Sequence, residues 1–131
     1  MEYTWNDTLK LGQPDIDAQH QEMFNLLMEL SVEMKKRARG KNKVNKILDT
    51  LETYSRQHFE LEEEHIVKNQ QLRKSNRVGY AEFLRKASRI RDLFEQGYYT
   101  QCRLINEEMF AWMYIHIRHV DQQLMANVLK V

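Results

Sequence analysis

Residues 42–65 read NKVNKILDTLETYSRQHFELEEEH and contain neither proline nor glycine. Apolar and metal-competent side chains recur in them at steps of three and four residues, which is the period of one face of an α-helix. His58 and Glu62 lie on this face, one turn apart, and Asn42 is a plausible cap at its start. The stretch predicts a bundle helix with an imidazole and a carboxylate on its interior side. The face comprises Val44, Ile47, Leu48, Leu51, Tyr54, His58, Leu61, Glu62 and His65.

Three further stretches show the same helical period. The first begins near Asp15 or Asp17, either of which can cap a helix, and Gly40 can terminate it. The next two end near Gly97 and Ile117. Their apolar positions are Met23, Phe24, Leu27, Met28, Leu30 and Met34, then Val78, Phe83, Leu84, Ala87, Ile90, Leu93 and Phe94, then Cys102, Ile105, Met109, Trp112, Met113 and Ile117.

Four helices with short connections predict an all-α fold, an up-down-up-down four-helix bundle. Residues 1 to about 16 predict an irregular arm laid across the bundle, and a short apolar tail follows the last helix. The scarcity of helix breakers, one proline and four glycines, agrees with this fold. At 131 residues the chain fits a single domain spanning residues 1–131.

Composition narrows the range of partners and compartments. The formal net charge of +1 gives no reason to expect a nucleic acid or an anionic membrane as a partner. A single cysteine, Cys102, excludes an internal disulfide and fits a reducing compartment. The N-terminus lacks the basic start and apolar run of a signal peptide, and no stretch is apolar for long enough to span a bilayer. We therefore expect a cytoplasmic protein.

Five metal-competent side chains occur at helical spacings. His20 lies on the first predicted helix, His58 precedes Glu62 by four residues, and His116 precedes Asp121 by five. Imidazoles and carboxylates gathered inside a helical bundle are ligands for iron or a similar transition metal. A separation of five residues turns about 140° on an ideal helix. Both side chains of the last pair reach the interior only if the helix loosens into a π-type bulge, or if the acid serves a second metal.

Taken together, these motifs resemble the hemerythrin family, and its bacterial single-domain members in particular. The resemblance covers nearly the whole chain and implies a four-helix bundle with two irons, bridged by an oxygen atom and by two carboxylates, that carries or senses O2. The matching positions, in order and at family spacing, are Trp5, Gly12, Ile16-Asp17-Ala18-Gln19-His20, His58-Phe59, Glu62-Glu63, Trp112, His116-Ile117 and Asp121.

The resemblance also implies a role for each ligand. His20 and His58 would bind the iron that takes O2, and His116 would bind the second iron. Glu62 and Asp121 would bridge the two ions. Apolar residues of the last helix, which are core residues first, would wall the O2 pocket and exclude water: Met109, Trp112, Met113 and Ile117.

One family feature is missing. The family supplies two more histidines, four residues apart, at the start of the third helix, and both bind the second iron. Aligned on Phe83, these positions hold Asn76 and Tyr80; counted without a gap from His58, they hold Arg77 and Ala81. Neither register restores the pair, so the second iron has lost two of its three histidines and the centre can hold two ions or one.

Two residues are possible substitutes. His65 shares a helix face with His58 and Glu62 and lies one turn beyond Glu62; the plainer interpretation is an ordinary helix residue. Tyr80 can offer a phenolate, a hard oxygen ligand suited to ferric iron. Alternatively, its ring packs in the core and its hydroxyl bonds elsewhere.

The metal motifs and the family resemblance together predict a non-haem iron protein that binds O2, or another small diatomic ligand, as a carrier, store or sensor, more readily than as an enzyme. One alternative is an iron enzyme acting on peroxide, O2 or NO. Another is a structural or interaction module that has kept only part of a metal site. The sequence does not indicate a redox partner.

Overall fold

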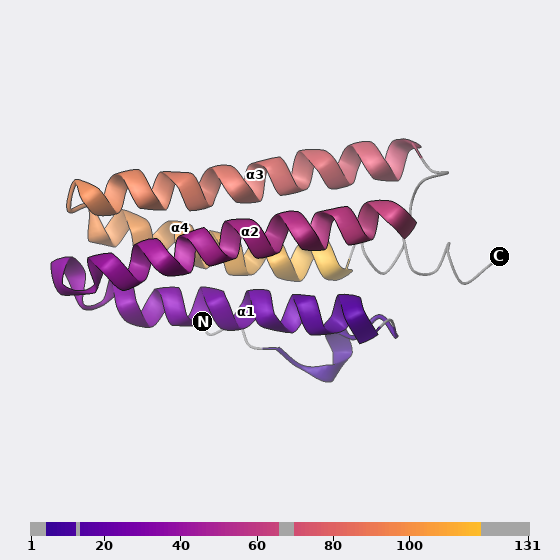
Figure 1. The fold of residues 1–131 in the computed structure, drawn as a ribbon, viewed down its shortest axis with the longest axis horizontal. Coiled ribbons are helices and arrows are strands. Elements are labelled where there is room, and N and C mark those ends of the chain that lie inside the picture. The colour runs from indigo at the N-terminus through magenta and orange to yellow at the C-terminus, as the bar shows by residue number, and fades with distance from the viewer. Residues whose placement is uncertain (1–4, 13, 66–69, 119–131) are drawn as a thin grey trace.

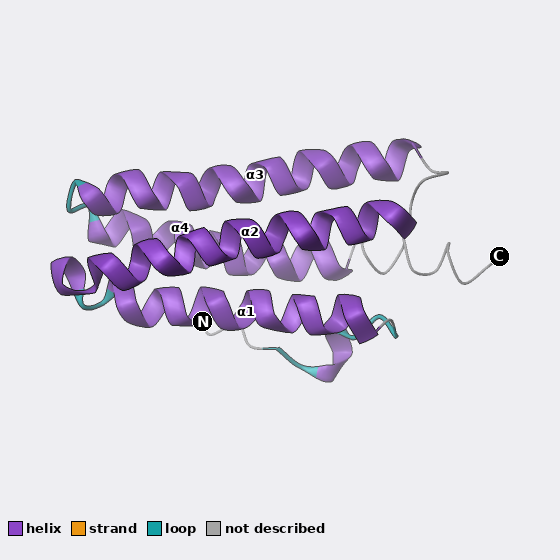
Figure 2. Cartoon of the chain, in the orientation of Figure 1, coloured by secondary structure: helices purple, strands orange, loops and turns teal. Residues whose placement is uncertain are grey.

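The computed structural model describes residues 5–12, 14–65 and 70–118. Within these ranges the chain forms four α-helices and no strand (Figure 1). Two short 3-10 helices, η1 (Asp7–Leu9) and η2 (Arg37–Gly40), precede α1 and α2 (Figure 2). The predicted all-α class, with four helices, is confirmed for these residues. The helices are α1 (Pro14–Met34), α2 (Lys41–His65), α3 (Gln70–Glu95) and α4 (Tyr99–His116).

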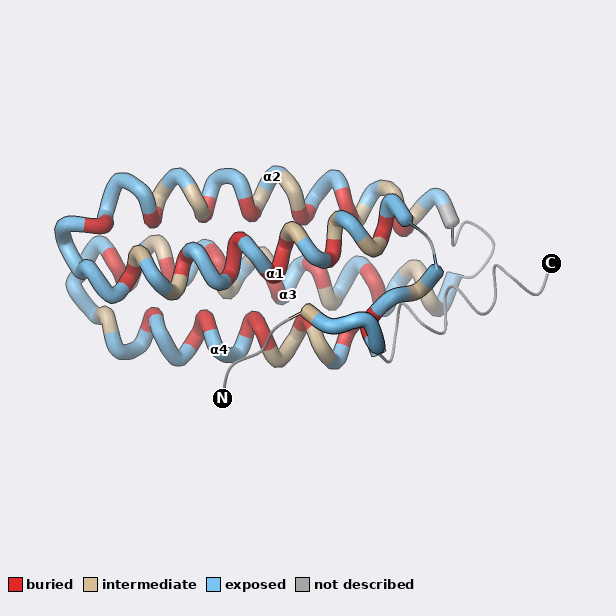
Figure 3. Tube along the Cα trace, turned by 90° about the horizontal axis from the view of Figure 1, so that it is seen from below, coloured by how far each residue is buried: buried red, intermediate tan, exposed pale blue. Residues whose placement is uncertain are grey.

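Each long helix packs against two others. Helix α1 contacts α2 and α4, and α3 contacts the same two helices, so the four enclose one interior. Figure 3 shows buried positions recurring along the helices, and on α2 and α4 they lie on the side that faces the other helices. Burial of one leucine or phenylalanine side chain contributes roughly 1.5–3 kcal/mol, which makes this interior the main source of stability. Its largest fully buried residues include Phe24, Leu27, Leu30, Leu48, Leu51, Phe83, Ile90, Met109 and Met113.

The segment before α1 is tied to the first turn of that helix. Helix α1 begins at Pro14, where a missing backbone N–H costs nothing. The Asp17 carboxylate accepts hydrogen bonds from the backbone N–H groups of Leu11 (2.8 Å) and Gly12 (3.2 Å). Gly12 has a φ of 85°, a left-handed conformation that glycine adopts without a steric penalty. Helix α1 thus starts at Pro14, just before the predicted start near Asp15 or Asp17. Before it, Leu9 of η1 is buried in the main core.

The corner between α1 and α2 differs from the sequence-based prediction. Helix α1 ends at Met34, not near Gly40, and α2 begins at Lys41, so Asn42 lies inside the helix and does not cap it. Gly40 belongs to η2 and is buried. A Cβ atom at this position would collide with the backbone carbonyl oxygen of Glu33. This glycine therefore allows a close backbone approach and does not simply end the first helix.

Two residues assigned to apolar interior faces are in fact exposed. Met28 is 44% exposed and Val78 is 58% exposed. Each residue of an α-helix is rotated by about 100° from the previous one. Met28 is therefore turned away from buried Leu27, and Val78 is turned about 200° from buried Tyr80. In the described part of the chain, no helix is long and apolar enough to cross a membrane.

Candidate metal site

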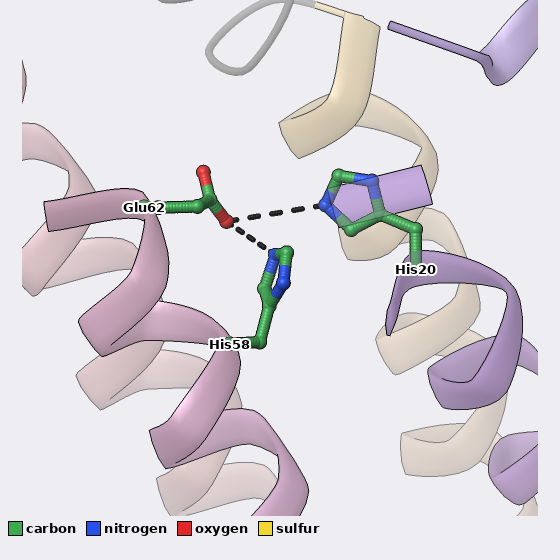
Figure 4. A group of neighbouring side chains, drawn as sticks. All are labelled: His20, His58 and Glu62. Atoms are coloured by element: carbon green, nitrogen blue, oxygen red, sulfur yellow. Dashed lines mark ion pairs between the residues drawn. The ribbon is translucent and has the colours of Figure 1, made fainter. Parts of the chain in front are cut away.

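A buried polar cluster lies where α1 begins and where α2 and α4 end. His20 comes from α1, His58 and Glu62 from α2, and His116 from the last turn of α4. The first three are 0% exposed and His116 is 4% exposed. Figure 4 shows the side chains of His20, His58 and Glu62 pointing toward one another across the gap between the two helices. Four of the five residues predicted as ligands are thus brought together.

One oxygen atom, Glu62 Oε1, is common to the contacts of this cluster. His58 Nε2 is its nearest histidine neighbour, in an ion-pair contact one helical turn away. His116 Nε2 lies 3.7 Å from it and His20 Nε2 lies 3.9 Å from it. The rings of His20 and His58 are 4.3 Å apart between centroids. The histidines of three helices therefore converge on a single carboxylate.

This geometry fits a transition metal ion. Ligand atoms of His20, His58 and Glu62 all lie within 4.8 Å of one another. Two ligands that each lie about 2.0–2.2 Å from one ion are separated by roughly 2.8–4 Å. The separations of His20 and His116 from Glu62 Oε1 match this range, and His58 lies closer to it. Imidazole nitrogen with carboxylate oxygen is a donor set that suits iron, among other metals.

Gln19 orients His58. The His58 Nδ1 atom lies 2.7 Å from Gln19 Oε1, so an Nδ1–H donates to this amide oxygen and leaves Nε2 available as a ligand. A hydrogen bond to the distal nitrogen of a metal-binding histidine fixes both its tautomer and its ring orientation. The sequence interpretation gave Gln19 no role of its own. The signal for this role was that Gln19 directly precedes His20 in α1. The same turn of α1 therefore supplies one proposed ligand, His20, and orients another, His58.

Helix α3 presents Asn76 and Tyr80 to the interior. Both are buried, whereas Arg77 and Ala81 are exposed. Of the two residue pairs that the sequence left open on this helix, the interior pair is therefore Asn76 and Tyr80. The Tyr80 hydroxyl donates a hydrogen bond of 2.8 Å to Glu62 Oε1. Asn76 is 0% exposed, and its amide N and O atoms have no hydrogen-bond partner among the residues described.

Trp112 and Gly79 set the position of His116. The Trp112 and His116 rings stack at 4.5 Å between centroids with an interplanar angle of 11°. A Cβ atom at Gly79 would lie 3.2 Å from Trp112 Cζ2 and 4.0 Å from His116 Nδ1. Glycine at this position thus lets the tryptophan pack closely on α3. Met109, Met113 and Ile117 are buried in the same core cluster as Tyr80, and their role as walls of a ligand pocket stays a prediction.

The end of α4 loosens after His116, and a π-type bulge at this place is one of the two alternatives that the spacing of His116 and Asp121 left open. Residues 117 and 118, directly after His116, adopt a π-helical conformation. Such a bulge changes the direction of the residues that follow. Asp121 lies outside the described residues, so its place as a ligand stays a prediction. His65 is the last residue of α2, and its side chain is also outside the described part, so its role as a ligand stays a prediction.

Next to the cluster, Glu63 ties the end of α2 to the start of α3. Its carboxylate accepts hydrogen bonds from Arg77 Nε (2.7 Å) and from Arg73 Nη2 (3.1 Å). The hydrogen bond from Arg77 has the largest effect and lowers the pKa of Glu63. Burial has the next largest effect and opposes this shift, and the hydrogen bond from Arg73 lowers the pKa further. These ion pairs hold together the two helix ends that carry Glu62 and Tyr80.

We expect Glu63→Gln to destabilise the metal-free fold at neutral pH, and the destabilisation to vanish in acid. A carboxyl whose pKa is lower in the folded state stabilises the fold above its unfolded-state pKa of about 4.3. That contribution is lost as the pH falls through the folded-state pKa. Urea unfolding of both proteins between neutral and acidic pH measures the difference. The exposed neighbour Glu64→Gln is the control, and a difference that stays constant with pH would contradict the assignment.

Three imidazoles, one carboxylate and one phenol thus meet in a buried space formed by all four helices. Such an arrangement can hold a metal ion, and it can hold a proton between Tyr80 and Glu62. No family model, curated protein or solved structure matched the chain.

Proposed function

We propose that this chain is a hemerythrin-like non-haem iron protein that binds O2 as a carrier, store or sensor. The observation that carries the proposal is the buried cluster of His20, His58 and Glu62, whose ligand atoms lie within 4.8 Å of one another. The resemblance of the motifs to bacterial single-domain hemerythrins points the same way. The proposal includes the up-down-up-down order of the helices, an N-terminal arm across the bundle, and a cytoplasmic location, which the single cysteine fits.

The donor set supports iron as the resident metal. Two histidines and one carboxylate that leave coordination positions open are typical of non-haem iron sites. When bound, iron supplies a redox-active Lewis acid with affinity for O2. His116, 3.7 Å from Glu62 Oε1, adds a donor from a third helix. The resemblance implies two ions, with Asp121 as the second bridging carboxylate, and the histidine-poor third helix leaves one ion as the alternative.

The surrounding residues keep the site dry and rigid. Gln19 fixes the ring of His58 through its hydrogen bond, and Trp112 stacks on His116. The buried side chains of Met109, Met113 and Ile117 lie in the core cluster next to these groups. Apolar walls suit an apolar gas, and they exclude the water that would otherwise solvate and protonate the site. The chain itself thus holds, orients and shields the ligands.

One observation favours a second candidate, an iron enzyme acting on peroxide, O2 or NO. The Tyr80 hydroxyl lies within hydrogen-bond distance of Glu62, so it is placed to donate a proton at the centre. Reduction of peroxide or O2 requires protons, whereas reversible O2 binding does not. The two candidates therefore differ in whether the small molecule is released unchanged.

Anaerobic loading with ferrous iron followed by admission of O2 tests the proposal. We expect an optical change on adding O2 to the iron-loaded protein and none in a His58→Ala variant treated identically. Recovery of the initial spectrum on purging with argon indicates a carrier or store, and a change without turnover indicates a sensor. Continuous consumption of O2 or peroxide would instead support the enzyme. A folded wild-type protein that takes up no iron would indicate the structural or interaction module.

A further inference from the structure

Tyr80 occupies a position that the resembling family gives to a histidine ligand. It projects from the interior face of α3 and is 2% exposed. We propose that Tyr80 is itself a metal ligand: its phenol oxygen, as a phenolate, completes a ferric centre with His20, His58, Glu62 and His116. This inference rests on the proposed iron site, and it specifies how the third helix contributes to that site.

The distance between the two oxygens supports ligation of one ion. The Tyr80 hydroxyl lies 2.8 Å from Glu62 Oε1, the same atom on which His20 and His116 converge. Two oxygens bound side by side to one ion at about 2.0 Å are separated by about 2.8 Å. The phenol oxygen therefore already has the spacing of a ligand adjacent to Glu62, and only a small adjustment is needed to admit the ion.

Four aromatic rings hold the phenol in this position. The Tyr80 ring centroid is 5.0 Å from that of His116 and 5.7 Å from that of His58, two of the ligands. It is 5.4 Å from Phe59 and 5.3 Å from Trp112, and all four pairs meet edge to face. Edge-to-face packing on several sides leaves the side chain little rotational freedom. A ligand that is preorganised in this way binds metal at a lower entropic cost.

The chemistry of phenolate selects the oxidation state. Phenolate is a hard anionic donor that matches ferric iron better than ferrous iron. On coordination the phenol O–H bond breaks, the oxygen binds the ion and one proton is released to solvent. Together with the Glu62 carboxylate, the phenolate leaves a ferric ion with a single net positive charge. If the ion took six ligands, these five protein donors would leave room for a small diatomic or anionic ligand.

This assignment narrows the proposed function. A carrier of O2 must rest in the ferrous state, because O2 is bound by reduced iron. A phenolate that stabilises ferric iron opposes that state and favours one-electron oxidation as the response of the centre. Among carrier, store and sensor, ligation by Tyr80 therefore favours the sensor, with an oxidising or small anionic molecule as the ligand.

The experiment loads metal-free protein with ferrous iron under argon, oxidises it in air, and records the visible spectrum and iron content. We expect the oxidised wild type to show a phenolate-to-iron charge-transfer band in the visible range. Tyr80→Phe removes only the hydroxyl, so it should retain the fold and abolish the band. Tyr99→Phe is the control, because Tyr99 begins α4 at the opposite end of the bundle and packs on Phe94. The reduction potential should be higher in Tyr80→Phe than in the control.

The outcomes separate the two proposals. If the wild type holds iron but shows no band, or if Tyr80→Phe keeps the band, the ligation is wrong and the iron site stands. A folded wild type without iron overturns both. Should Tyr80→Phe fail to fold, resonance Raman spectra of the wild type, excited in the visible band, decide the matter: phenolate ring modes support ligation by tyrosine, and their absence excludes it.

Discussion

His58→Ala and Glu62→Ala are each expected to lose most of the iron that the wild-type protein binds. His58 supplies an imidazole whose orientation Gln19 fixes, and Glu62 supplies the oxygen on which three histidines and Tyr80 converge. Loss of an outer hydrogen bond to a metal ligand already weakens binding by about 10–100-fold. Loss of a ligand itself should therefore reduce affinity by at least about 100-fold.

Elemental analysis after dialysis against a defined concentration of free ferrous iron measures this effect. Glu64→Ala is the matched control, because Glu64 is an exposed carboxylate two residues from Glu62 on the same helix. Gln19→Ala should give an intermediate loss, since it removes the orienting group and leaves the ligand in place. Wild-type iron content in both His58→Ala and Glu62→Ala would exclude the site.

Removal of the metal is expected to lower the melting temperature by roughly 10 °C. A ligand that binds only the native state at about 100 times its dissociation constant stabilises that state by about 2.7 kcal/mol. For a chain of this size, each kcal/mol shifts the melting temperature by roughly 3–5 °C. The proposed ligands come from α1, α2 and α4, so a bound ion would cross-link three helices in addition to their core packing and hydrogen bonds.

Thermal melts of iron-loaded protein with and without a chelator measure this shift by circular dichroism. The Glu62→Ala variant serves as the control, because a protein without the site should melt at the same temperature in both conditions. A wild-type melting temperature that the chelator leaves unchanged would support the structural or interaction module instead.

The all-helical fold could be predicted because its signal is repeated along the chain. Residues 42–65 combine an apolar period of three to four residues with an absence of breakers, and α2 occupies Lys41–His65. The ends of elements were less predictable, since they depend on contacts made in the folded chain. Gly40 illustrates this: its interior role is set by the Glu33 carbonyl and not by its neighbours in sequence.

The sequence predicted which ligand residues of one helix point in the same direction. It predicted less well which residues of a neighbouring helix would face them. The four-residue spacing of His58 and Glu62 implies a common direction, and the structure shows both buried in one cluster. Tyr80 could not be distinguished from Ala81 as an interior residue, because the sequence allowed two registers for α3. Burial of Asn76 and Tyr80 resolves that ambiguity. The contact between Gly79 and Trp112 depends on the packing of α3 against α4, which no local pattern encodes.

The most direct test of the central claim is the iron content per chain of protein purified under argon and loaded with ferrous iron, measured by elemental analysis. The proposed site, built on His20, His58 and Glu62, predicts between one and two irons per chain, retained on gel filtration. Folded protein that retains far less than one iron per chain, no more than its Glu62→Ala variant, would contradict it.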